Sequence, residues 1–276
     1  MQKLAQGQIK KMKTQWGEPV SYHLPIGDQS IDMNALIGQE ILLEFTSAIE
    51  CIYCGRATKK SFSQGYCFPC MKSLAQCDVC IMSPEKCHYA AGTCREPEWG
   101  DTHCMVDHIV YLSNASGLKV GITRASQVPT RWIDQGAIQA IPMLRVATRH
   151  LSGLAEVIFK QETSDRTNWR KMLKNDVEPL DLAAERERLF NTLDAEIKAL
   201  ATAHGESAIE RLETETAVAI QYPVTAYPEK VKSFNLDKDP QVRGQLQGIK
   251  GQYLILDGGV INLRKYTGYH LALSAA

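Results

Sequence analysis

The sequence has no long hydrophobic run and no excess of charge of either sign. No stretch approaches the roughly 20 apolar residues that span a membrane, and the basic N-terminus MQKLAQGQIKKMKTQW lacks the apolar centre of a signal peptide. We therefore expect a soluble, cytoplasmic protein that does not bind membranes. The 31 Lys and Arg residues balance the 31 Asp and Glu residues, so the overall charge does not require a nucleic-acid partner.

Cysteine is absent from most of the chain. All nine cysteines lie between Cys51 and Cys104, whereas a secreted disulfide scaffold would be shorter and would spread its cysteines along the chain. The same segment is poor in aliphatic residues, so it cannot form an ordinary hydrophobic core and needs another source of stability. Clustered cysteines in a reducing compartment point to metal binding.

Length and hydrophobic patterning predict an α+β protein. With 276 residues, of which 44% are hydrophobic, the chain fits two domains or one domain with an appendage. We expect the β segments at the two ends to pair, in a small barrel, because short strands need more than one neighbour. The predicted segments are an N-terminal β segment (1–50), a cysteine-rich zinc-binding segment (51–106), a mixed domain (107–175), charged helices (176–215) and a C-terminal β segment (216–276).

The mixed domain has an ordered pattern of elements. From 108 to 163 the hydrophobic periodicity predicts two strands, a helix near 128–136, a third strand and a second helix, which gives the order β-β-α-β-α. In the C-terminal segment VAIQYPVTAY, GQYLILDGG and VINLRKY read as strands, separated by Gly, Pro and Asp turns.

The most specific motif is CxxC-x12-CxxC, formed by Cys51, Cys54, Cys67 and Cys70. Each two-residue turn aims two sulfurs at one point, so the four thiolates can hold one structural zinc ion tetrahedrally. This arrangement is typical of a zinc-ribbon or treble-clef module. Two alternatives remain open. The cysteines could be buried free thiols or a redox pair, or they could hold an iron–sulfur cluster in a redox protein.

A second group of potential ligands follows the first. Its most economical site consists of Cys77, Cys80, Cys87 and Cys94, so we expect one or two zinc ions in all. Three other residues could replace a member without violating any spacing rule: His88, His103 and Cys104.

Two tripeptides resemble the motifs of a nuclease superfamily. Ile109-Val110-Tyr111 and Lys119-Val120-Gly121 are similar to the paired motifs of GIY-YIG endonucleases, whose domain has the same β-β-α-β-α order. The resemblance implies a catalytic arginine at Arg131 and a metal-binding glutamate at Glu156. Lys119 stands where the family has the first tyrosine of YIG, as in divergent branches with KIG or KVG. Arg124 competes with Arg131, and Asn168 is the one candidate for the family's asparagine.

The resemblance also implies a mechanism. Glu156 would hold Mg²⁺ or Mn²⁺ at the scissile phosphate, Arg131 would stabilise its charge, and Tyr111 would help to activate water. A hard cation with oxygen ligands and a guanidinium suit phosphodiester hydrolysis. The alternative is that Tyr111 is an ordinary strand residue and that Arg131 and Glu156 are solvated surface residues.

The overall charge is neutral, but basic and acidic residues are concentrated in different parts of the chain. Between Lys119 and Lys174 there are ten basic and four acidic residues, a local excess of six positive charges. Between Asp176 and Glu215 there are eleven acidic and four basic residues, an excess of seven negative charges. The basic region could bind the phosphates of DNA or RNA, or it could pair with the acidic helices of the same molecule.

Over most of its length the sequence resembles an uncharacterised bacterial family that combines a cysteine-rich zinc-binding segment with a domain of unknown function. The segments that carry this likeness are HIVYLSNASGLKVGITR and QVPTRWIDQGA. Our first hypothesis is therefore a zinc-binding, nucleic-acid-binding protein with a nuclease-like domain. The alternative is a non-catalytic, zinc-stabilised scaffold for a protein partner.

Overall fold

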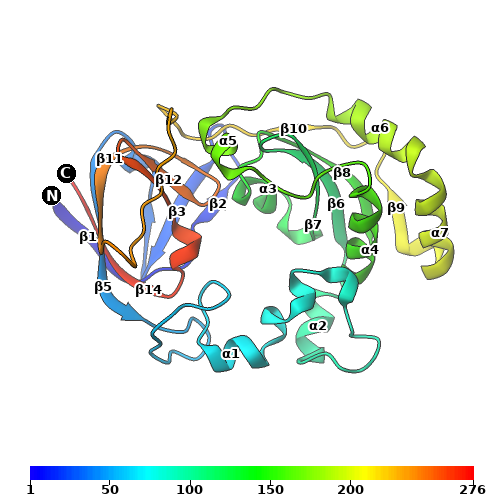
Figure 1. Cartoon of the computed structure of the whole chain (residues 1–276), viewed down its shortest axis with the longest axis horizontal. Helices are drawn as coiled ribbons and strands as arrows, with labels where there is room; N and C mark the ends of the chain where they lie inside the picture. Colours follow the sequence, from blue (N-terminus) through cyan, green and yellow to red (C-terminus); the bar gives the residue numbers. More distant parts are fainter.

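The computed structural model describes all residues from 1 to 276 and confirms the expected α+β fold. Strands from both ends of the chain form one antiparallel sheet of six strands, in which Gln2 lies opposite Ala275. The two termini therefore lie side by side (Figure 1). In sheet order, the strands are β1 (Gln2–Gln8), β14 (Tyr269–Ala275), β5 (Glu40–Ile49), β11 (Gln241–Lys250), β12 (Tyr253–Leu256) and β13 (Gly259–Asn262).

A second, three-stranded sheet packs against the first. It consists of β2 (Lys13–Gln15), β3 (Ser21–Ile26) and β4 (Gln29–Asp32), and a bridge between Ile9 and Ile26 connects it to the end of β1. Alternate residues of β3 are fully buried, as expected for a strand with one face on a core. The six-stranded order is open, with β1 and β13 at its edges. The unit is thus a pair of packed sheets, where we expected a barrel.

Four C-terminal strands differ from the prediction. The strands β11 and β14 were missed. The strand β11 is rich in Gln and Gly and has few apolar residues, and pairing with β5 and β12 holds it in place. The predicted strand VAIQYPVTAY is reduced to β10 (Val218–Ala219), since Pro223 interrupts the pattern. In VINLRKY the strand ends at Asn262, whose side chain accepts a hydrogen bond from Arg264 N (3.1 Å) and starts a 3-10 turn.

A third, five-stranded sheet, here called the central sheet, is covered on both faces. All seven residues of β6 (His108–Asn114) are buried. Ile109 and Tyr111 point into the core shared with the paired sheets, whereas Val110 and Leu112 point into a second core under the helices. This division follows from the two-residue period of a strand. The other strands of this sheet are β7 (Leu118–Arg124), β8 (Gln139–Val146), β9 (Ile209–Arg211) and β10.

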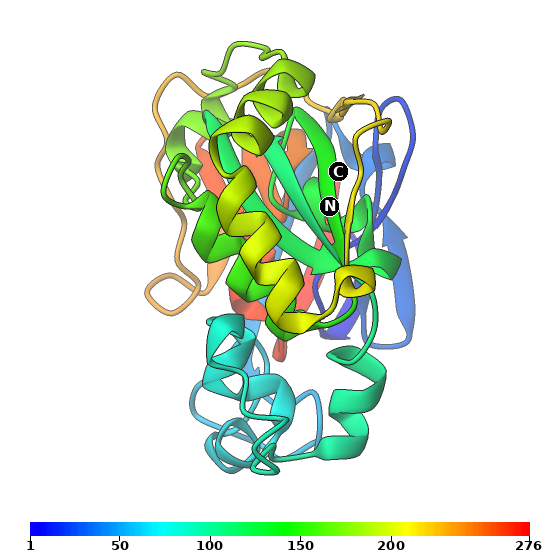
Figure 2. The same ribbon diagram turned by 90° about the vertical axis from the view of Figure 1, so that its right-hand side faces the viewer.

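Three helices, α4 (Arg149–Phe159), α6 (Leu182–Thr192) and α7 (Asp194–His204), cover the second core (Figure 2). Thr148 and Asp181 cap α4 and α6, accepting hydrogen bonds from Leu151 N (3.2 Å) and Ala184 N (3.0 Å). No helix is both long and apolar enough to span a membrane. From β6 to α4 the observed order is β-β-α-β-α. The other helices of this half are α3 (Thr130–Asp134) and α5 (Trp169–Lys174).

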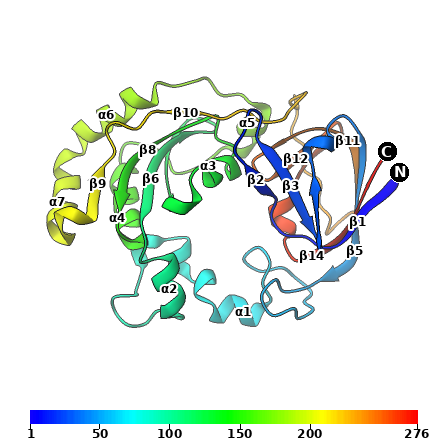
Figure 3. The same ribbon diagram turned by 180° about the vertical axis from the view of Figure 1, so that it is seen from behind.

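The cysteine-rich segment joins the two halves along one side of the molecule (Figures 1 and 3). It contains α1 (Phe68–Ser73), α2 (Pro97–His103) and three short 3-10 turns. Its own core has four buried residues, three of which are cysteines. One end packs against the paired sheets, where Ser61 donates to Thr267 O (2.9 Å). The other end packs on α4, where Gly153 lies against Pro84.

We predict that Gly153→Ala destabilises the protein. Inside a helix this change usually stabilises by about 0.5–1 kcal/mol. Here the new methyl carbon would lie 2.6 Å from the carbonyl carbon of Pro84, so we expect the free energy of unfolding to fall by about 1–3 kcal/mol. Denaturant unfolding measures it. Val157→Ala, an exposed change on the same helix, is the control, and an unchanged or more stable Gly153→Ala protein would contradict the contact.

Candidate metal centre and basic cleft

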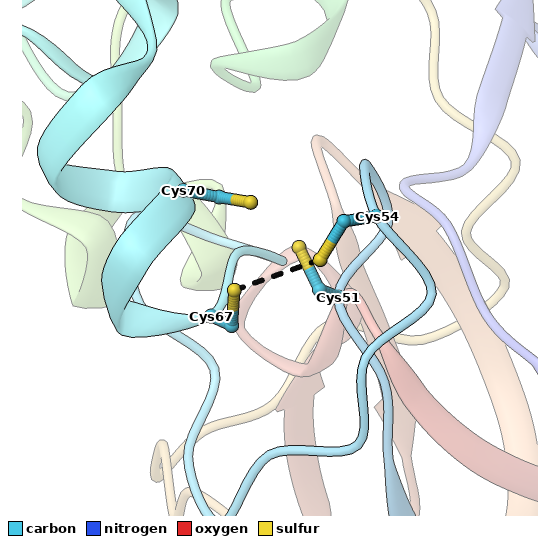
Figure 4. A group of neighbouring side chains, drawn as sticks. All are labelled: Cys51, Cys54, Cys67 and Cys70. Carbon is cyan, nitrogen blue, oxygen red and sulfur yellow. Dashed lines mark hydrogen bonds between the residues drawn. The ribbon is translucent and has the colours of Figure 1, made fainter.

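The four cysteines of the CxxC-x12-CxxC motif come together (Figure 4). Their sulfur atoms all lie within 4.8 Å of one another, and the Sγ atoms of Cys54 and Cys67 are 3.7 Å apart. A zinc ion with four sulfurs at about 2.3 Å needs sulfur atoms about 3.8 Å apart, whereas a disulfide needs about 2.05 Å. The geometry therefore fits one tetrahedral ion.

Local structure explains this convergence. Cys51 and Cys54 follow β5 in a turn closed by a hydrogen bond from Gly55 N to Cys51 O (2.9 Å), and Gly55 has a φ of +70°. Cys67 is the N-cap of α1, and Cys70 lies in its first turn. Three of the four cysteines are buried, and only Cys54 is exposed. The four cysteines could thus hold a zinc ion.

The thiols also interact electrostatically. Burial opposes ionisation of Cys51, but the backbone amides of Cys54, Cys67 and Tyr53 outweigh it and lower its pKa to about 6. Burial and the neighbouring cysteines raise the pKa of Cys70. Without an ion, one thiolate therefore hinders ionisation of the next, and a divalent cation would remove that repulsion.

The second predicted ligand set does not stay together. Cys80, Cys87 and Cys94 line one small cavity, but Cys77 is not among its lining residues. Cys77 packs instead against the first cluster and lines a different cavity. The separation arises because the 3-10 turn that ends at Cys77 and the one that contains Cys80 are divided by Asp78, which has an extended backbone.

A cleft of about 410 Å³ contains most of the residues suggested by the nuclease resemblance. Lys119, Arg131 and Glu156 all line it, and so does Arg124. Seven basic and three acidic side chains line this basic cleft, a difference of four positive charges. They are Lys11, Lys119, Arg124, Arg131, Arg149, Lys160 and Arg264, with Asp134, Glu156 and Asp165.

Tyr111 lies behind the cleft wall. Its side chain is fully buried, and its hydroxyl donates to Gln135 Oε1 (3.1 Å). Burial raises the pKa of Tyr111 to about 12, although Arg131 opposes that shift. Gly121 faces Tyr111 across the strand pair, and a Cβ there would lie 2.7 Å from the hydroxyl. The tyrosine ring therefore requires glycine at this position.

Lys119 shares the same acceptor. Its Nζ donates to Gln135 Oε1 (2.7 Å), and the residue is only 4% exposed. Burial and then the nearby Arg131 lower the pKa of Lys119 to about 8. The lysine can thus change its charge in the range in which ordinary lysines remain protonated.

Glu156 is paired on its own helix. Lys160 Nζ lies 3.4 Å from the Glu156 carboxylate and 3.0 Å from Asp165. Burial raises the pKa of Glu156, and Lys160 opposes that shift. Two carboxylates and one ammonium group therefore occupy this side of the cleft.

The acidic helices do not neutralise the cleft. None of the ion pairs joins a cleft residue to the acidic region 176–215, because α6 and α7 pack on the second core.

Asn168 caps α5, accepting from Arg170 N and Lys171 N (both 3.2 Å), and does not line the cleft. Sequence reasoning missed Lys11 and Arg264, which come from opposite ends of the chain. The four-residue spacing of Glu156 and Lys160 could have revealed their pairing.

We predict that Cys67→Ser removes one metal equivalent per chain. Thiolate ligation contributes folding energy, so hydrogen exchange in residues 51–74 should also become much faster. Elemental analysis and exchange mass spectrometry measure the two effects. Cys77→Ser, which changes a neighbouring cysteine outside the cluster, should leave the metal content intact. Equal metal content in the Cys67→Ser and unmodified proteins would rule out this centre.

Comparisons with known proteins identify a family but no relative of known activity. Searches of curated proteins and of solved structures gave no match. A family model matches residues 38–271, a range that contains all nine cysteines and every charged residue of the basic cleft except Lys11. The chain thus belongs to the family described as protein of unknown function (DUF2797).

Proposed function

We propose that this protein binds a nucleic acid in the basic cleft and hydrolyses a phosphodiester bond there. One observation carries the proposal: Lys119, Arg131 and Glu156 are widely separated in sequence but line the same positively charged cleft. Phosphate groups would neutralise its excess of basic side chains. DNA and RNA share this backbone chemistry, so both are candidate substrates.

The fold also supports the proposal. The order β6-β7-α3-β8-α4 is the one expected of a GIY-YIG-like domain, and the two motif strands pair with Tyr111 opposite Gly121. Arg131 lies on α3 and Glu156 on α4, the two helices that carry the corresponding residues in that superfamily. We treat the domain as a divergent example, since Lys119 replaces a tyrosine.

The residues of the cleft have complementary roles in the proposed reaction. Water adds to phosphorus, the ester P–O bond breaks, and the leaving oxygen takes up a proton. Arg131 would bind the negative charge that develops on the phosphate oxygens. Glu156 and Asp165 would hold Mg²⁺ or Mn²⁺, which supplies further charge neutralisation when bound. Lys119 would position the phosphate and, when neutral, accept a proton from water.

A second candidate function is binding without catalysis. Two observations favour it. The Tyr111 hydroxyl is buried and bonded to Gln135, so it is not free to activate water. Glu156 is already paired with Lys160. In this reading the metal-stabilised fold is a scaffold for nucleic acid or for a protein partner with an acidic surface.

The proposal includes a cytoplasmic location. All nine cysteines are free thiols, and reducing compartments keep thiols available for metal. The zinc at the first centre would be structural, because four thiolates leave no open coordination position.

We predict that Glu156→Gln lowers Mg²⁺- or Mn²⁺-dependent cleavage by roughly 100-fold or more and leaves binding intact. The change removes a negative charge from the cation site but keeps the shape of the side chain. Cleavage of labelled DNA and RNA and fluorescence anisotropy measure the two activities. Glu162→Gln, an exposed change six residues along the chain, is the control.

Three results would contradict different parts of the proposal. Equal cleavage by the Glu156→Gln and unmodified proteins would assign the activity to a contaminant. Salt-sensitive binding without any cleavage would favour the non-catalytic function. No salt-sensitive binding to either nucleic acid would remove the basic cleft as a nucleic-acid site.

We also predict that nucleic-acid affinity falls as pH rises from 7 to 9. The pKa of Lys119 is lowered to about 8, so the lysine is a cation at the lower pH and increasingly neutral at the higher pH. Loss of one charged hydrogen bond should weaken binding about tenfold. Anisotropy titrations at constant ionic strength measure it. Lys119→Met should bind more weakly at pH 7 and show a smaller pH dependence, whereas Lys174→Met, an exposed change outside the cleft, should keep the full dependence.

A further inference from the structure

The cysteine-rich segment contains a second, smaller cavity, and four of its 12 lining residues are cysteines. These are Cys80, Cys87, Cys94 and Cys104. They are carried by separate turns, with six, six and nine residues between successive members. The accessible volume is about 10 Å³, which is room for a single water-sized sphere. Cys104 is buried and the other three are half-buried, so the cavity lies largely inside the segment.

Cys104 replaces Cys77 in this set. It is the C-cap of α2, and its carbonyl accepts a hydrogen bond from Arg149 N (2.7 Å) at the start of α4. Cys77 lies instead beside Ser63 and Tyr66, in the cavity near the first centre. Cys77 therefore lies between the two sets of four cysteines in the sequence and belongs to neither.

The sulfur atoms of the four cysteines that line the cavity do not all lie within 4.8 Å of one another, so an ion held by them would draw the thiols closer together. Asp78 and His88 form an alternative set with Cys80, whose ligand atoms do lie within 4.8 Å of one another. Their polar atoms already have partners. Asp78 accepts from Arg95 Nε (2.6 Å) and from Cys80 N (3.3 Å). One ring nitrogen of His88 bonds to Thr93 Oγ1 (2.8 Å), and the other lies 3.5 Å from Asp78. These residues thus form a polar frame around the thiols.

The charges around the cavity suit four thiolates. Arg95 lines it, and Arg149 Nη2 donates to Ile81 O (2.6 Å), next to Cys80. Four thiolates on a divalent ion leave two net negative charges, which Arg149 can offset in part, since Arg95 is already paired with Asp78.

We propose that Cys80, Cys87, Cys94 and Cys104 hold a second structural metal ion, of the zinc class. The thiol set is closed, so the ion has no open position for substrate. Its effect is architectural. It ties Cys80 to Cys104. Arg149 donates hydrogen bonds to the carbonyl oxygens of Cys104 and of Ile81, the residue after Cys80. The ion thereby fixes Ile81, Met82 and Pro84, which form one wall of the basic cleft.

The test is the metal content of the full chain purified after growth with zinc. We expect two equivalents in the unmodified protein, one in Cys104→Ser, and two in both Cys77→Ser and His88→Ala. The Cys67→Ser/Cys104→Ser double variant should bind none. One equivalent in the unmodified protein, two in Cys104→Ser, or loss of an ion in Cys77→Ser or His88→Ala would overturn the proposal.

A measurement on the unmodified protein guards against misfolding of the variants. Zinc-edge X-ray absorption should give a shell of sulfur alone at about 2.3 Å, whereas ligation by His88 or Asp78 would add nitrogen or oxygen at about 2.0–2.2 Å. A mixed shell would overturn the proposed ligand set. Neither experiment depends on nucleic-acid binding or on cleavage, so the outcome is independent of the function proposed for the cleft.

Discussion

Convergence of thiol groups is the interaction on which the rest of this structure depends. The cysteine-rich segment joins β5 to β6, yet its own apolar core has only four buried residues, three of them cysteines. Such a core cannot offset the conformational entropy of ordering the segment. Metal ligation would add its binding energy to the folding energy. A metal ion held by the four thiols would therefore support the connection between the two halves of the molecule, together with hydrophobic packing.

The basic cleft shows why that connection matters. Lys11 and Arg264 come from the paired sheets, and the remaining lining residues come from the central sheet, its helices and their connections, except for three from the cysteine-rich segment: Ile81, Met82 and Pro84. Asp134 reinforces the junction by pairing with Lys11 and accepting from Gln252 Nε2 (2.8 Å). A site assembled from three parts keeps its shape only while each part is held in place. A structural metal ion and the chemistry proposed for the cleft would thus be linked through geometry.

Part of this fold and site could be predicted from the sequence. The β-β-α-β-α order followed from the hydrophobic pattern, in which a strand with two buried faces, such as β6, begins as a continuous apolar run. The strand β11 could not be recognised, because its Gln and Gly residues have little intrinsic strand preference and its neighbours supply the pairing. Cys77 was grouped with Cys80 because a CxxC spacing permits convergence. The extended backbone at Asp78 separates them.

The sequence by itself determined the interactions that are short in range. The CxxC-x12-CxxC motif places four thiols in one centre, because two-residue turns restrict where their sulfurs can point. Gly121 opposite Tyr111 likewise follows from the pairing of two adjacent strands. Only the tertiary structure decided which distant side chains share the cleft, that Tyr111 lies behind it, and that Cys104 joins the second set of thiols. Those results depend on how separate elements pack, and no local spacing specifies packing.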